Sequence, residues 1–145
     1  MQDNATPFTP APLPVRVAAM IYESLLVIAV LFVASFIALP VVGDLHRDWQ
    51  RYLFQAYLVV VLFAYFAAFW LRSGQTLAMK TWRIRLDDQA GGRISPRQAG
   101  LRFLVALAGA LLFGAGFWWA LFDRDRQCFH DRVAGTRLVR MPPKA

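Results

Sequence analysis

The stretch "VRVAAMIYESLLVIAVLFVASFIAL", from Val15 to Leu39, decides what kind of protein this is. From Val17 to Leu39 the residues are apolar or small, with a single charged side chain, Glu23. A helix that crosses the hydrocarbon core of a bilayer, ~30 Å thick, needs about 20 such residues. The stretch therefore predicts a membrane-spanning helix that carries a carboxylate inside it.

Two further segments have the same character. Tyr52–Leu71 carries no charge, and Leu101–Phe122 is interrupted only by Arg102. Across the 145 residues, 58% are hydrophobic, against about 45–50% in soluble domains, and one small soluble core cannot bury so much apolar surface. We expect an all-α membrane protein with three hydrophobic helical segments.

The ends of the chain differ in composition from its middle. Residues 1–15 contain four prolines and no basic residue, which is typical of a disordered tail. The predicted organisation is a disordered tail over residues 1–15, a membrane domain over residues 16–141 and a short tail over residues 142–145.

Basic residues set the expected orientation, because loops rich in Lys and Arg stay on the cytoplasmic side of a membrane. The loop between the second and third segments is rich in arginine, whereas in Pro40–Arg51 two arginines are balanced by Asp44 and Asp48. We expect a multi-pass protein of the bacterial inner membrane whose N-terminus and middle loop are cytoplasmic.

The C-terminal tail is also basic, although three full crossings would place it outside. Gly109, Gly114 and Gly116 weaken helix formation within the third segment. That segment either bends and re-enters, which leaves the tail inside, or is an ordinary helix whose glycines pack against neighbouring helices. We favour the broken or re-entrant form slightly.

Two short basic segments alternate apolar and polar residues, "TWRIRL" at Thr81–Leu86 and "TRLVRM" at Thr136–Met141. Alternation with a period of two is a strand signal. The two segments are expected to pair as a small sheet on the membrane surface, with the apolar side chains toward lipid. Four arginines would then contact lipid head groups: Arg83, Arg85, Arg137 and Arg140.

Glu23 is the most informative polar residue. A charged side chain near the bilayer centre costs about 2.5–3.5 kcal/mol, so such residues face protein or water and often have a partner. Arg16 lies seven residues earlier on the same helix face, and Arg102 on the third segment is the alternative partner. A protonated Glu23 without a partner is a third possibility. The residue is either a structural contact between helices or a proton or cation site.

Other functional classes find little support. His130 and Asp131 are adjacent, but the sequence offers no nucleophile beside them and no spacing typical of metal ligands. We therefore expect no enzyme activity, no metal and no cofactor. The formal net charge of +7 comes from residues that flank apolar spans, so anionic lipid, rather than nucleic acid, is the expected partner.

The chain is similar to the RDD family of bacterial membrane proteins. The similarity rests on the arginine that opens the first helix, on "SGQTLAMKTWRIRLDDQAGGRIS" after the second segment, and on "WALFDRDRQCFHDRVAGTRLV" after the third. The family is named for one arginine and two aspartates, which map onto Arg16, position 23 and Asp131. Position 23 is Glu23 here, which keeps the charge and lengthens the side chain by one methylene.

What the resemblance implies about function is limited, because the family's molecular activity is largely undefined and transport has been suggested. It points to one polar cluster of Arg16, Glu23 and Asp131, with an Arg16–Asp131 pair and with Arg102 and His130 as further partners. Transport of an ion or small solute is the first expectation, and it would need a homo-oligomer or a partner subunit. The alternative is a non-catalytic adaptor that docks lipids or a protein through the basic loop and tail.

Overall fold

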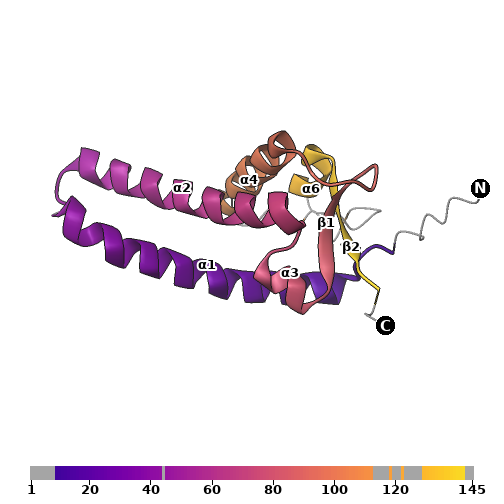
Figure 1. The fold of residues 1–145 in the computed structure, drawn as a ribbon. Coiled ribbons are helices and arrows are strands. Elements are labelled where there is room, and N and C mark those ends of the chain that lie inside the picture. Colours follow the sequence, from indigo (N-terminus) through magenta and orange to yellow (C-terminus); the bar gives the residue numbers. More distant parts are fainter. Residues whose placement is uncertain (1–8, 44, 113–117, 119–121, 123–128, 143–145) are drawn as a thin grey trace, which may run out of the picture.

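Two long antiparallel helices form the main body of the computed structural model, which describes residues 9–43, 45–112, 118, 122 and 129–142 (Figure 1). Helix α1 spans Leu13–Val42 and helix α2 spans Asp48–Ser73, with 30 and 26 residues. Both are long and apolar enough to cross a membrane, and only 6% of each apolar window is buried within the protein. The central helix of a soluble domain would be mostly buried, so these exposed apolar surfaces are typical of a membrane protein.

Small residues and one tyrosine join the two helices. Ala34 and Ala38 lie one turn apart on α1 and are buried, as expected where two helix backbones approach closely. The hydroxyl of Tyr57 on α2 donates to the carbonyl oxygen of Ala34 at 3.5 Å. Contacts of this kind replace the hydrophobic effect, which is weak between helices surrounded by lipid.

The third apolar segment begins with helix α4, Pro96–Leu111. Ser95 and Gln98 form a capping box at its start, and the helix has 16 residues, too few for a full crossing. Gly109 lies inside α4, while Gly114 and Gly116 lie outside the described residues. The structure therefore does not confirm a third membrane-spanning segment of full length. Helix α6, Phe129–Ala134, packs on α4 and lies near the end of the molecule where α4 begins.

The predicted pairing of the two basic segments is confirmed. Strand β1, Ile84–Asp88, pairs antiparallel with strand β2, Thr136–Arg140, with Leu86 opposite Leu138. Strand β1 begins at Ile84 rather than at Thr81, because Thr81 ends a short helix, α3, Leu77–Thr81, and a turn over residues 82–83 follows it.

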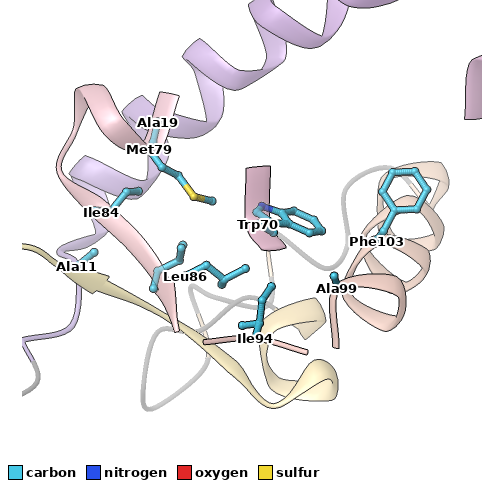
Figure 2. Packing of buried hydrophobic residues seen from close by; sticks show 10 residues of the cluster. Ala11, Ala19, Trp70, Met79, Ile84, Leu86, Ile94, Ala99 and Phe103 are labelled. Atoms are coloured by element: carbon cyan, nitrogen blue, oxygen red, sulfur yellow. The ribbon is translucent and has the colours of Figure 1, made fainter. Parts of the chain in front are cut away.

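The apolar side chains of this sheet face protein rather than lipid, which corrects the expectation of a sheet lying on the membrane. Ile84 and Leu86 are 1% exposed, and they contribute to a core with residues from α1, α2, α3 and α4. Figure 2 shows Trp70 of α2 at the middle of this cluster, between the strand residues and Phe103 of α4. The sheet is covered because α3 and the helix ends supply apolar surface.

The N-terminal segment also belongs to this end of the molecule. The amide of Ala11 donates to the carbonyl of Leu138 at 3.3 Å, and the amide of Arg140 donates to the carbonyl of Thr9 at 3.0 Å. Residues 9–15, which the sequence analysis placed in a tail, thus include residues that bond to β2 and the start of α1. Residues 9–11, the middle loop and β2 lie together at one end of the helix pair (Figure 1).

Gly74 offers a test of how the helix pair is joined to the sheet. It ends α2 with φ of +68°, and an added Cβ would lie 2.8 Å from the carbonyl oxygen of Leu86. Gly43, which ends α1, has φ of +71° but no atom within 4 Å of such a Cβ.

We expect Gly43→Ala to lower stability by about 1–3 kcal/mol, because φ of +71° with ψ of −144° is a strained conformation for a residue with a Cβ. Gly74→Ala should lower stability by clearly more, because the backbone of β1 at Leu86 must also move. Thermal unfolding midpoints in detergent would measure both, and equal shifts would contradict the close approach of Gly74 to β1.

Candidate functional site

Glu23 of α1 contacts α2 and the residue that caps α3. Its carboxylate accepts hydrogen bonds from two hydroxyl groups, that of Tyr65 on α2 at 3.2 Å and that of Thr76 at the start of α3. Both partners are neutral. Among the described residues, the ion pairs that the structure shows do not include Glu23.

Thr76 explains why the carboxylate is held in this position. Its side chain is fully buried, and its hydroxyl oxygen caps α3 by accepting the amide hydrogen of Met79 at 3.3 Å. A hydroxyl group has one proton to donate, and that proton points to Glu23. With Tyr65 donating to its other oxygen, both carboxylate oxygens accept a hydrogen bond.

A buried ion pair lies next to this site, between Arg102 of α4 and Asp131 of α6. The side chains are 5% and 1% exposed. Arg102 also donates to the hydroxyl of Thr136 at 3.3 Å, and its guanidinium lies 5.1 Å from the centre of the Trp70 ring. One side chain therefore contacts α2, α6 and β2.

The structure shows Arg102 as a partner of Asp131, a contact that the sequence analysis proposed for Arg16. Of the alternatives left open for Glu23, the structure shows a contact between helices made through hydroxyl groups. The reason for the Arg102–Asp131 contact is positional, because α4 packs against α6. Arg16 is itself buried on α1, 3% exposed, at the same end of the molecule.

His130 completes the buried polar group. Its Nε2 lies 3.7 Å from the carboxylate of Asp131, and the residue is 5% exposed. Burial, together with the positive charge of Arg102, lowers the pKa of His130 well below the ordinary value for histidine. His130 is therefore neutral at physiological pH.

Glu23, Arg102 and His130 line one pocket of about 420 Å³. Its walls come from α1, α2 and α4, with single residues from α3, β1 and α6, and they are apolar apart from these three side chains and Ser24. A volume of this size is typical of sites for small molecules. One cavity is therefore lined by three residues that the sequence analysis named, Glu23, Arg102 and His130. Asp131 lies behind this lining and pairs with Arg102.

The four arginines expected at lipid head groups have different surroundings. Arg83 and Arg140 are exposed, and the bond from the amide of Met141 to the carbonyl of Arg83 at 2.8 Å places them near each other. Arg85 is engaged with Asp87 through two hydrogen bonds of 2.6 and 2.8 Å. Arg137 is half-buried and lies opposite Asp87 in the sheet. Head-group contact stays a prediction for all four.

Sequence reasoning did not find Tyr65, Thr76 or Thr136. Tyr65 is one of several aromatic residues in an apolar helix, and threonine is common in loops, so neither residue type signals a carboxylate partner. Thr76 had one available signal, its place directly before the short run that became α3. Within the described part of the chain, no group of three or more His, Cys, Asp or Glu side chains is arranged to bind a metal.

The Arg102–Asp131 pair predicts a large asymmetry between single and double variants. Either Arg102→Met or Asp131→Leu leaves a buried charge without its main partner, which typically costs about 3–5 kcal/mol. The double variant should be more stable than either single variant. Thermal unfolding in detergent would measure this, with Arg93→Met, at an exposed loop position, as the control. Additive losses would show that the two side chains do not form a pair.

His130 predicts a pH dependence of stability. Above about pH 6.5, histidine is neutral in both the unfolded and the folded protein. Below that pH, the histidine side chain binds a proton in the unfolded protein but stays neutral in the folded protein, because the pKa of folded His130 is lowered. The free energy of unfolding therefore falls as pH falls. Between pH 7.5 and 5.5 the unfolding midpoint should drop further for the natural protein than for His130→Gln. Parallel profiles would contradict the buried neutral state.

Comparison with known proteins places the chain in a family. The sequence profile of the RDD family matches residues 10–135. An uncharacterized protein of Rickettsia prowazekii, strain Madrid E, is 31% identical over 83 residues, which cover 57% of this chain and 46% of that protein. The chain thus spans less than half the length of this relative. No solved structure matches the chain. This match covers helices α1 and α2, strand β1 and the Arg102–Asp131 pair. The chain therefore belongs to the RDD family.

Proposed function

We propose that this protein transports an ion or a small solute across a membrane and that Glu23 is the group that attracts it. The observation that carries the proposal is the position of this carboxylate on the wall of a pocket between apolar helices, held by two neutral hydroxyl groups. A charge kept at membrane depth without a cationic partner is costly. Such a charge is retained where a proton or a cation supplies the missing positive charge during function.

The neighbouring ion pair supports this division of roles. Arg102 and Asp131 neutralise each other, and their burial beside the core fixes the position of α4. Arg102 and Glu23 both line the pocket, but the charge of Arg102 is met by Asp131, whereas Glu23 is held by neutral hydroxyl groups and is open to a ligand. We assign the structural role of joining the helices mainly to the Arg102–Asp131 pair. The carboxylate of Glu23 is then available for binding.

We further propose that the protein is a multi-pass protein of the bacterial inner membrane. Residues 9–11, the middle loop and β2 lie at one end of the helix pair. Because this end is rich in arginine, the preference of positive loops for the inside places it in the cytoplasm. Two long helices cannot enclose a pathway alone, so a homo-oligomer or a partner subunit completes it.

A second candidate function is a non-catalytic adaptor. It is favoured by the proximity of Arg83 and Arg140, which are exposed at the sheet end of the molecule. Two basic side chains at this position suit anionic lipid head groups, each contributing about 1 kcal/mol near a charged surface. Such a role requires no flux.

The transport proposal predicts a flux that depends on Glu23. Purified protein in vesicles that contain a pH-sensitive dye would be given gradients of protons, Na⁺, K⁺ and an organic cation, tetramethylammonium, in turn. We expect a change of internal pH or cation content that is lost in Glu23→Gln and retained in Glu23→Asp, which keeps the charge. The control variant Asp48→Asn also removes one negative charge, but at the start of α2, far along that helix from Tyr65, the partner of Glu23. It should leave the flux unchanged.

Size-exclusion profiles and unfolding midpoints would establish that each variant is folded. Equal flux in folded Glu23→Gln and in the natural protein would contradict the assigned role of Glu23. Flux no faster than in empty vesicles under every gradient would overturn the transport proposal in favour of the adaptor.

A further inference from the structure

The pocket has a polar end and an apolar end. Along α1 its wall runs from Ala19 to Ile28, about 13 Å at 1.5 Å per residue. Near the sheet it contains Arg102 and His130, with Glu23 one helical turn from Ala19. Away from the sheet the wall is formed by aliphatic and small side chains, namely Val27, Ile28, Leu62, Leu107 and Ala110.

The charges that line the polar end of the pocket determine which kind of ligand group fits there. The positive charge of Arg102 is already met by Asp131, and its guanidinium is stacked against Trp70. His130 is neutral, because burial and Arg102 lower its pKa. Of the ionisable side chains that line the pocket, Glu23 alone brings a charge that no opposite charge within the described residues balances. The lining therefore favours a cation over an anion.

Size and wall chemistry decide the rest of the ligand. A volume of about 420 Å³ is far larger than an inorganic ion needs, and the aliphatic end offers no ligands to a hydrated one. Phe66, Trp70 and Phe103 add aromatic surface to the lining, which attracts organic cations through their ring faces. Each carboxylate oxygen of Glu23 accepts one hydroxyl hydrogen and keeps a free lone pair.

We propose that this pocket binds a lipophilic organic cation, with the positive centre at Glu23 and the apolar body along α4 toward Ala110. The inference rests on the proposed transport function, for which it names the class of solute. In this proposal the apolar walls of the pocket contact the apolar body of the ligand, a contact that a hydrated ion could not make.

Tetraphenylphosphonium and tetraphenylborate are suitable probes, because they have nearly the same shape and opposite charge. Binding would be measured by equilibrium dialysis with the protein in nanodiscs of zwitterionic phosphatidylcholine, after subtraction of the uptake by empty nanodiscs. We expect at least tenfold tighter binding of the phosphonium than of the borate. Glu23→Gln should weaken phosphonium binding at least tenfold, and Asp48→Asn should not.

A second pair of variants tests the cavity without changing the carboxylate. Ala106 lines the pocket on α4, whereas Ala108 is exposed on the same helix and does not line it. Ala106→Phe should fill the pocket and weaken phosphonium binding at least tenfold, while Ala108→Phe should bind as the natural protein does. This comparison stands even if Glu23→Gln does not fold.

Equal binding of the two ions would show a general apolar cavity and overturn the proposal. Unchanged phosphonium binding in folded Glu23→Gln or in Ala106→Phe would also overturn it. Flux of protons, Na⁺ or K⁺ without phosphonium binding would reject this inference and leave the transport proposal intact. Phosphonium binding at Glu23 without any flux would support the site and reject transport.

Discussion

The ion pair between Arg102 and Asp131 is the interaction on which the rest of the structure depends. It joins α4 to α6, and through the hydroxyl of Thr136 and the ring of Trp70 it reaches β2 and α2 as well. Gln98 reinforces the same junction, because its amide donates to Asp88 of β1 at 2.9 Å and to the carbonyl of Gly135 at 3.5 Å. The short polar elements are thereby fixed to the end of a helix pair that is otherwise apolar.

The two acidic residues of the family motif have different environments, and the difference gives them different chemistry. Asp131 is almost fully buried beside a cation, so its charge is balanced within the protein. Glu23 is half-buried beside two hydroxyl groups, so its charge is solvated but not balanced. Glutamate reaches Thr76 and Tyr65 with one methylene more than aspartate has. A longer side chain at position 23 is compatible with hydroxyl donors, which rotate to meet it.

The sequence allowed the two long helices and the β1–β2 pairing to be anticipated. These features follow from local patterns, namely uninterrupted apolar length and alternation with a period of two. The partners were not predictable in the same way. Arg102 and Asp131 meet because α6 returns to the start of α4, which no spacing encodes. The covered face of the sheet depended on α3, a five-residue helix too short to show periodicity.

The strand pairing has a consequence for how the chain is made. Strand β2 lies far along the chain from β1, and it also holds residues 9–11 through the bonds of Ala11 and Arg140. During synthesis, α1 and α2 emerge first, and each has enough apolar length to enter a bilayer before β2 exists. Residues 9–11 must then wait, undocked, until β2 leaves the ribosome and closes over them. Assembly of this end therefore follows insertion of the helix pair.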